Sequence, residues 1–176
     1  MSEYYYAASA PAGLTSGRHF KRSRSIKSDD PLNLRGPLEV VGSLKSGRSI
    51  SLEGDFVVRG KLDAYGDITM NGSVTCEGDI KAYGNISVTG YLSARYGVPG
   101  VNGIKGYGKL KIEGTLEGTE VEVYGNLSIT GYLKCRKLVV YGSLTLIGPS
   151  STYVVEESEE VVGAKLMREQ EADWEF

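Results

Sequence analysis

Histidine and cysteine are almost absent from this chain, which has one histidine and two cysteines. A structural zinc site takes four Cys or His ligands, commonly in closely spaced pairs. Cys76 and Cys135 lie far apart and both occupy apolar positions of a repeat, so we expect them to be buried free thiols. His19, the single histidine, lies outside that repeat. The sequence therefore predicts no metal site, no cofactor and no histidine base for catalysis.

Long apolar runs and a strong charge are also missing. No stretch approaches the roughly 18 apolar residues that a membrane-spanning helix requires, and no signal-peptide pattern opens the chain. The formal net charge is -2, and residues 31–150 carry thirteen Lys/Arg against eleven Asp/Glu. Such a balanced body offers no electrostatic footprint for nucleic acid. We therefore expect a cytoplasmic protein that does not bind nucleic acid.

Glycine, in contrast, is abundant, and 21 of the 24 glycines lie in residues 31–150. From Gly36 they recur mostly every sixth residue, and a large apolar residue follows two positions later, as at Leu62, Ile68, Val74, Ile80, Ile86 and Leu92. Between residues 36 and 100, Arg48 is the only charged residue at an even number. A period of two over such a length predicts β-strands with one buried face. We expect each glycine to form a bend between consecutive strands.

A longer repeat lies above the six-residue one, because the Tyr-Gly pairs that begin at residues 65, 83, 107, 124 and 141 are spaced by 18, 24, 17 and 17 residues. Three arms of about six residues therefore form one coil, and stacked coils form a parallel sheet. The predicted fold is all-β, a parallel β-helix (β-solenoid) of six to seven coils. The Gly- and Pro-rich segment 95–107 is expected to bulge out as a loop, either as a tolerated insertion or as a partner-binding loop.

Three regions are expected along the chain. Residues 1–30 are basic and serine-rich and predict a disordered tail. Residues 31–150 form the solenoid, and residues 151–176 form an acidic tail in which a short helix could occur. The basic run near the N-terminus could contact a membrane surface or wall-associated proteins, and Ser23 and Ser25 beside arginines are candidate phosphorylation sites.

Enzymatic solenoids do not fit the pattern. Hexapeptide-repeat acyltransferases place the small residue directly after the large aliphatic one, and they use a histidine base. Polysaccharide-degrading β-helices use clusters of calcium-binding acids, which this sequence lacks. The glycines also do not match a phosphate-binding loop. We therefore expect a protein that is not an enzyme and has no catalytic residue.

One tyrosine per coil falls in the outward register, so these side chains should form a ladder along one edge. The set is Tyr65, Tyr83, Tyr107, Tyr124 and Tyr141. Stacking of like side chains between coils explains such a ladder. A lateral contact stripe for filament bundling or a wall polymer is the alternative explanation.

With the run GDITMNGSVTCEGDIKAYGNISVTG (66–90), the chain resembles the bactofilin family over roughly residues 36–148. The resemblance implies a right-handed β-helix with disordered tails. It also implies a cytoskeletal scaffold subunit that polymerises end to end into filaments without nucleotide.

Open coil ends carry unpaired backbone groups that template another chain. We expect the homopolymer contact at Leu38 and Val40 in the first coil and at Leu144 and Leu146 in the last. The alternative is a monomeric or dimeric solenoid that binds a protein or a glycan.

Overall fold

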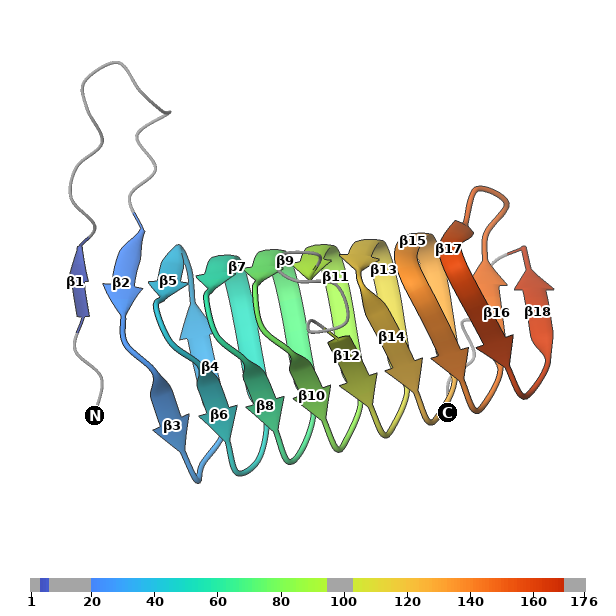
Figure 1. Cartoon of the computed structure of the whole chain (residues 1–176). Helices are drawn as coiled ribbons and strands as arrows, with labels where there is room; N and C mark the ends of the chain where they lie inside the picture. Colours follow the sequence, from blue (N-terminus) through green and yellow to red (C-terminus); the bar gives the residue numbers. More distant parts are fainter. Residues whose placement is uncertain (1–3, 7–19, 95–102, 170–176) are drawn as a thin grey trace, which may run out of the picture.

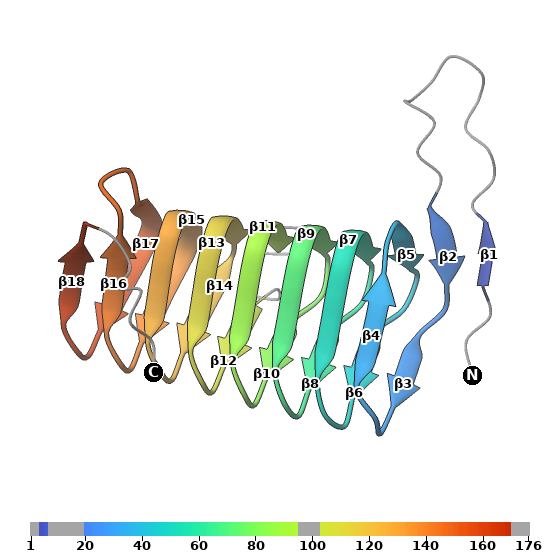
Figure 2. The ribbon, with the colours of Figure 1, turned by 180° about the vertical axis from the view of Figure 1, so that it is seen from behind.

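The alternating pattern produces short parallel strands, each stacked on its equivalent one coil earlier (Figure 1). The computed structural model describes residues 4–6, 20–94 and 103–169, and all regular elements among them are strands. The coils follow one another in sequence order from the N-terminal to the C-terminal end of a rod, as its two opposite views show (Figures 1 and 2). The β-solenoid prediction is therefore confirmed.

Each coil has three arms, and equivalent arms stack into three faces that we call A, B and C. Face A contains β2 (Lys21–Ser23), β5 (Leu38–Val40), the ends of β7 (Ile50–Val58), β9 (Ile68–Cys76), β11 (Ile86–Ala94) and β13 (Leu110–Gly118), the middle of β15 (Leu127–Val140) and the start of β17 (Thr152–Val161). Face B contains β3 (Ile26–Ser28), β6 (Leu44–Ser46), β8 (Leu62–Ala64), β10 (Ile80–Ala82), β12 (Gly103–Gly106), β14 (Glu120–Val123) and the ends of β15 and β17. Face C contains β4 (Leu32–Arg35), the starts of β7, β9, β11, β13 and β15, then β16 (Leu144–Ile147) and β18 (Lys165–Arg168).

The interior is a continuous apolar core formed by the inward residues of all three faces. Its largest fully buried side chains include Phe56, Met70 and a series of leucines and isoleucines. The inward set predicted from the six-residue repeat is buried throughout. Cys76 and Cys135 are buried free thiols, and burial raises the pKa of both to about 12. These thiols are therefore protonated and packed as small apolar groups.

Glycine serves the coils in two different ways. Between faces C and A, a column of glycines has φ values from +109° to +137°: Gly54, Gly72, Gly90, Gly114 and Gly131. These positions match the predicted role of glycine as a residue that tolerates positive φ. At the corner between faces B and C, glycine is instead required because consecutive coils approach closely. A Cβ on Gly125, for example, would lie 2.5 Å from the Gly108 carbonyl oxygen.

Coil length varies only at one corner between Leu38 and Val140, the corner that joins face A to face B. Three residues separate the arms there in a regular coil, as between Cys76 and Ile80. The fifth coil has nine residues between Ala94 and Ile104, and the sixth has two between Gly118 and Val121. The predicted insertion therefore connects the arms at this corner, and its residues 95–102 lie outside the described residues. Its range was too long, because Gly103–Gly106 is strand β12 and an integral arm.

The solenoid is also longer than predicted, with eight coils in place of six to seven. Strands β2, β3 and β4 form a first coil, so residues 21–30 are not a disordered tail. Strands β17 and β18 form the last coil, so the helix considered for the acidic segment does not occur over residues 152–168. One further strand, β1 (Tyr4–Tyr6), pairs antiparallel with β2.

Candidate functional site

The predicted tyrosine ladder is present at the corner between faces B and C. Consecutive ring centroids from Tyr65 to Tyr141 are 5.2, 5.1, 4.8 and 4.7 Å apart, and the planes differ by 6° to 24°. Each ring follows a face B strand, and its backbone N–H donates to the coil before it, as Tyr83 does to Ala64. Stacked aromatic pairs contribute roughly 0.5–1.5 kcal/mol beyond burial. The ladder therefore helps to hold consecutive coils together.

The same stacking limits what the ladder can bind. The rings cover each other's faces and expose their edges and hydroxyl groups, with 36% to 58% of each residue exposed. Lys81 Nζ lies 4.8 Å from the Tyr83 centroid, and Tyr124 donates a 2.9 Å hydrogen bond to Glu122, which raises the pKa of Tyr124 to about 12. A sugar ring stacks on an exposed aromatic face, and the inner rings of the ladder have none. The exposed edge is better suited to a protein surface than to a glycan.

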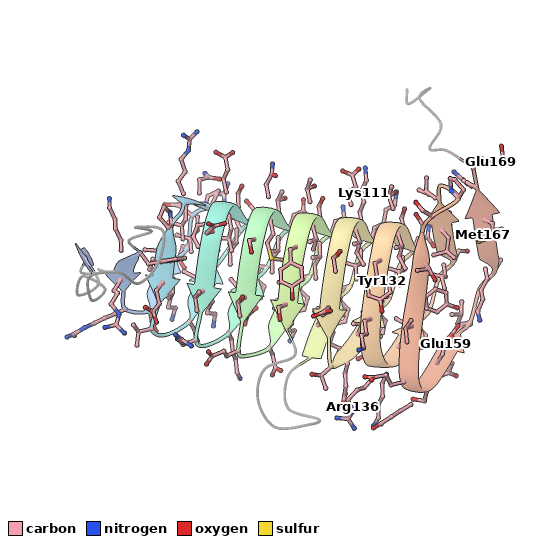
Figure 3. All side chains as sticks on the ribbon, turned by 90° about the horizontal axis from the view of Figure 1, so that it is seen from above. Lys111, Tyr132, Arg136, Glu159, Met167 and Glu169 are labelled. Carbon is pink, nitrogen blue, oxygen red and sulfur yellow. The ribbon has the colours of Figure 1, made fainter. Side chains whose placement is uncertain are left out.

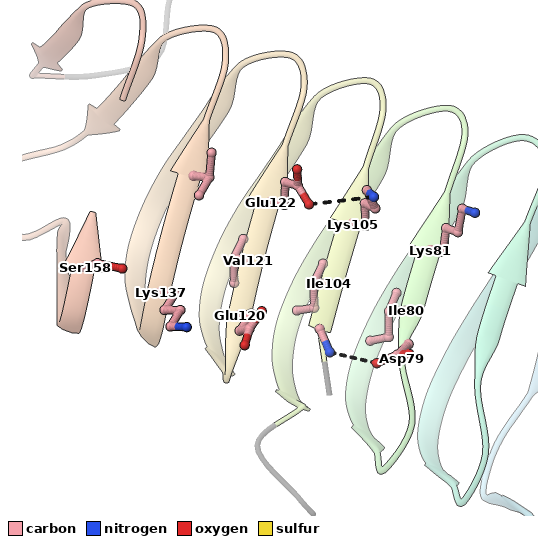
Figure 4. Close-up of a pocket in the computed structure, with 12 residues that line it drawn as sticks. Asp79, Ile80, Lys81, Ile104, Lys105, Glu120, Val121, Glu122, Lys137 and Ser158 are labelled. Carbon is pink, nitrogen blue, oxygen red and sulfur yellow. Dashed lines mark hydrogen bonds and ion pairs between the residues drawn. The ribbon is translucent and has the colours of Figure 1, made fainter. Parts of the chain in front are cut away.

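A shallow groove of about 350 Å³ crosses the outside of face B (Figure 4). Its walls carry charges of both signs, with Lys81, Lys105 and Lys137 among Asp79, Glu120 and Glu122. Asp79 accepts a hydrogen bond from the Gly103 amide at 2.9 Å, and Lys105 lies 3.8 Å from Glu122. The charges thus largely compensate one another and hold the coils in register.

The polar groups that line the groove are of few kinds. Its polar lining consists of lysines, carboxylates, one serine and backbone. Across the described residues, no group of three His, Cys, Asp or Glu side chains could hold a metal ion. In the same part of the chain, no helix has the length and apolarity to cross a bilayer.

At the N-terminal end of the rod, the inward positions of the first coil are polar at Lys21, Ser23 and Ser28 and apolar at three other residues. Ile26 is buried, and Leu32 and Leu34 are partly buried against the core below them. Among the described strands, β3 pairs only with β6 and β4 only with β7, so each has one unpaired edge. The outer edge of β2 is occupied by β1. Two of the three arms at this end are therefore open.

At the C-terminal end, an ionisable residue occupies an inward position on each of the three faces. In the register of the coils, Tyr153, Glu159 and Lys165 lie over Leu133, Leu138 and Leu144. The Tyr153 hydroxyl donates to Glu159 Oε2 at 2.7 Å, and Lys165 Nζ lies 2.5 Å from the same oxygen. Burial alone would raise the pKa of Glu159, but the hydrogen bonds from Lys165 and Tyr153 outweigh it and lower that pKa. We call these three residues the polar lid.

Apolar side chains surround the polar lid. Val155 and Val161 are partly buried against the core, whereas Val162 and Met167 are 61% and 69% exposed. Glu159 and Met167 both lie on the outermost coil at this end (Figure 3). Among the described strands, β17 pairs only with β15 and β18 only with β16. The C-terminal end therefore combines open strand edges, exposed apolar groups and the Glu159–Lys165 ion pair, whose two charges cancel.

The residues predicted for the polymer contact are not at the ends. Leu38 and Val40 lie in the second coil beneath β2 and are buried. Leu144 and Leu146 lie in the seventh coil beneath β18; Leu144 is buried and Leu146 partly buried. The prediction of these four as end-coil residues is wrong, because the first and last coils were taken for tails. Stepping back 18 residues from Leu44 and Ile50 reaches Ile26 and Leu32, a signal that could have revealed the first coil.

The two candidate phosphorylation sites lie in different surroundings. Ser23 is 1% exposed, and its hydroxyl donates to the Arg24 carbonyl. Its burial contradicts the prediction that Ser23 is accessible to a kinase. Ser25 is exposed, and its hydroxyl accepts a 2.9 Å hydrogen bond from the Ser43 amide of the next coil. Phosphorylation of Ser25 stays a prediction.

Comparisons with protein-family models, with curated proteins and with solved structures find no match for this chain. The resemblance to the bactofilins therefore stays a prediction. The features from which a function can be inferred are the two open coil ends and the tyrosine ladder.

Proposed function

We propose that this protein is a structural subunit that self-assembles end to end into filaments or scaffolds, in the manner that its resemblance to the bactofilins implies. In this proposal it is a cytoplasmic protein, neither an enzyme nor dependent on nucleotide or cofactor. Its main partner is a second copy of itself. Contacts with a membrane surface or with wall-associated proteins would involve its terminal segments.

The observation that carries the proposal is the state of the two ends. Among the strands that the structure describes, the arms on faces B and C have an unpaired outer edge at the N-terminal end, and β17 and β18 have one at the C-terminal end. Unpaired strand edges pair readily with another chain. Stacking a second copy would also cover Leu32 and Leu34, which one subunit buries only in part. Burial of apolar area contributes about 25 cal/mol per Å².

An end-to-end contact of this kind would join the strand edges of two subunits on the faces where those edges are open. Each added subunit presents a new open end, so growth does not close on itself. The contact needs no ligand, because the strands and the apolar core supply the interactions. A filament is therefore the natural product of two open ends on one rod.

A binding module for another protein is the second candidate function. The exposed edge of the tyrosine ladder favours it, because aromatic side chains are enriched at protein interfaces. In a filament the same edge would run along the side of each subunit and could act as a lateral contact stripe. A glycan ligand is disfavoured because the inner rings stack on one another.

The proposal is tested with the full chain by sedimentation velocity and negative-stain electron microscopy over a range of concentrations. Leu32→Lys places a charge in the apolar end contact, and a buried unpaired charge opposes association strongly. Asn33→Lys is the matched control, because Asn33 is exposed on the same strand. We expect filaments from the wild type and from Asn33→Lys, and a folded small species from Leu32→Lys. A wild type that stays monomeric at every concentration would contradict the proposal.

A further inference from the structure

An uncharged, hydroxyl-rich surface covers strands β9 and β11 on faces C and A. From Thr69 to Thr75 and from Ser87 to Ser93, every outward residue is serine, threonine, asparagine or tyrosine. The strand before them, β7, carries Glu53 and Asp55 in the equivalent outward positions. The strand after them, β13, carries Lys111, Glu113 and Glu117. The neutral surface is therefore bounded by charged residues on both sides along the rod.

Tyr91 lies in this surface, directly after Gly90 at the corner between faces C and A. Its hydroxyl donates a 3.1 Å hydrogen bond to Glu117, which lies one coil further on and two residues further along the strand. To reach Glu117, the side chain has to lean across the neighbouring strand. Only 37% of Tyr91 is exposed, although its neighbours in the column, Ser73 and Thr115, are small. One face of the ring therefore lies toward the sheet and the other toward solvent.

A second tyrosine takes the same position two coils later. Tyr91, Thr115 and Tyr132 are successive members of one column. The ladder rings of the same three coils lie 5.1 and 4.8 Å apart, so Tyr91 and Tyr132 are attached about 10 Å apart, two strand spacings. Tyr132 is partly exposed and lies on the side of the rod that Figure 3 shows. Within the described part of the chain, neither of the two rings is stacked on another, unlike the ladder rings.

This spacing matches a β-1,4-linked sugar chain. Successive sugars in such a chain are rotated by half a turn, so the same face recurs on every second sugar, at a distance close to two strand spacings. One sugar on Tyr91 and one on Tyr132 would leave the sugar between them over Thr115. Tyrosine suits this contact because it presents a large apolar ring beside a polar group. The C–H face of a sugar packs on the ring, and the sugar hydroxyls reach the polar groups around it.

The polar groups beside this path are available to a ligand. The hydroxyls of Ser73, Thr89 and Thr115 form no hydrogen bond within the part of the chain that the structure describes. A hydroxyl can both donate and accept, as the hydroxyls of a sugar require of a partner. Glu113, at the edge of the path, is already paired with Lys111 at 3.2 Å. An uncharged chain can therefore be bound without leaving a desolvated charge uncompensated.

We propose that the protein binds an uncharged, β-1,4-linked glycan chain, laid along the rod over Tyr91, Thr115 and Tyr132. This surface is distinct from the tyrosine ladder, in which the rings cover one another's faces. It lies on the side of the rod, so the inference does not depend on contacts between coil ends. A filament would repeat the surface along its length, and a long glycan could then contact several subunits with increased avidity.

The test titrates the full chain with three hexasaccharides by isothermal titration calorimetry. Cellohexaose and chitohexaose are β-1,4-linked chains of glucose and of N-acetylglucosamine, and maltohexaose is the α-1,4-linked control, whose chain curves. We expect at least one β-linked chain to bind and maltohexaose to bind about tenfold more weakly or not at all. A trisaccharide of the bound series reaches both rings and a disaccharide only one, so affinity should rise about tenfold or more between them.

Variants test the two rings and their spacing. Tyr91→Ala and Tyr132→Ala should each weaken binding about tenfold, whereas Tyr91→Phe keeps the ring and should bind nearly as the wild type does. Thr115→Tyr/Tyr132→Thr preserves the composition but moves the second ring to the adjacent coil, where the two rings would stack on each other. Its affinity should fall as in Tyr132→Ala. Tyr65→Ala, at the 58% exposed end of the ladder, is the matched control and should bind as the wild type does.

The proposal fails if neither β-linked chain binds, if maltohexaose binds equally well, or if both alanine variants keep the wild-type affinity. A loss confined to Tyr65→Ala would place the glycan on the ladder and would also overturn it. Circular dichroism checks that each variant is folded. Sedimentation velocity follows assembly separately, so filaments that bind no sugar would refute this inference alone, and a monomer that binds sugar would refute only the end-to-end assembly.

Discussion

Replacing Gly72 by alanine should strongly destabilise the solenoid. Gly72 lies in the glycine column between faces C and A with φ of +135°, a region that side chains with a Cβ rarely adopt. Holding alanine there costs on the order of 1–3 kcal/mol. The new Cβ would also lie 2.3 Å from the Gly54 carbonyl oxygen, well inside contact distance. The coils would have to separate at this corner, which weakens the strand pairing on both sides.

The two effects together predict a loss of about 3 kcal/mol or more in the free energy of unfolding. For a chain of this size, each kcal/mol lowers the melting temperature by roughly 2–4 °C. Gly72→Ala should therefore melt about 6–12 °C below the wild type when unfolding is followed by circular dichroism. The matched control is Gly103→Ala, because a Cβ there meets no atom closer than 3.6 Å, the Glu120 oxygen.

Gly103→Ala should melt at the wild-type temperature or slightly above it, since alanine restricts the unfolded chain by about 0.4–1 kcal/mol. Equal melting temperatures for Gly72→Ala and the wild type would refute the steric reasoning. An equal loss for both variants would show that any side chain at a glycine is disruptive, whatever its surroundings.

Three further predictions concern the core, the insertion and the response to acid. Ile80→Ala, at a fully buried inward position, should lower the free energy of unfolding by about 2–5 kcal/mol. Ser87→Ala, on the outward side of the next arm, should lower it by less than about 0.5 kcal/mol. Equal losses of stability in thermal melts would contradict the register. Deleting residues 97–102 should leave the β circular-dichroism spectrum intact, because it shortens the corner between Ala94 and Ile104 to the three residues of a regular coil; loss of the spectrum would argue against it. Burial alone would raise the pKa of Glu39, but hydrogen bonds from two arginines outweigh burial and lower that pKa below its ordinary value of 4.5. These hydrogen bonds therefore stabilise the folded chain above a pH of about 4.5, and their contribution is lost as the pH falls through the lowered pKa. Melting curves of Glu39→Gln should consequently depend less on pH between about 6 and 3 than those of the wild type, and parallel curves would count against this ion-pair network.

The middle of the fold could be predicted because every level of the sequence agrees there. Alternation, the six-residue glycine repeat and one tyrosine per coil all indicate the same stacked arms, and the structure confirms the inward set and the ladder. The sequence could not distinguish the two uses of glycine, because positive φ and close approach of the backbone both exclude a side chain.

The first and last coils could not be recognised in the sequence, and the reason is physical. Terminal coils are covered on one side only, so their inward positions tolerate polar residues, and the alternation that identifies a strand fades. Ser23 and Ser28 occupy inward positions of the first coil, and Glu159 and Lys165 occupy those of the last. These same polar residues give the two ends their distinct chemistry. The residues that hide the ends from sequence analysis are thus the ones that decide how the ends can be used.

The corner between faces A and B has a practical consequence for redesign of the rod. The other two corners are kept at constant length by columns that must stack, glycines at one and tyrosines at the other. The corner between faces A and B has stacked glycines in the second to fourth coils (Gly42, Gly60 and Gly78). Beyond them it accommodates connections of nine or two residues, while the strand registers on either side persist. The fifth to seventh coils therefore each have a site at this corner at which a foreign peptide could be grafted. Epitopes grafted at these successive sites would form a row, and the distance between neighbours in the row would be set by the spacing of parallel strands.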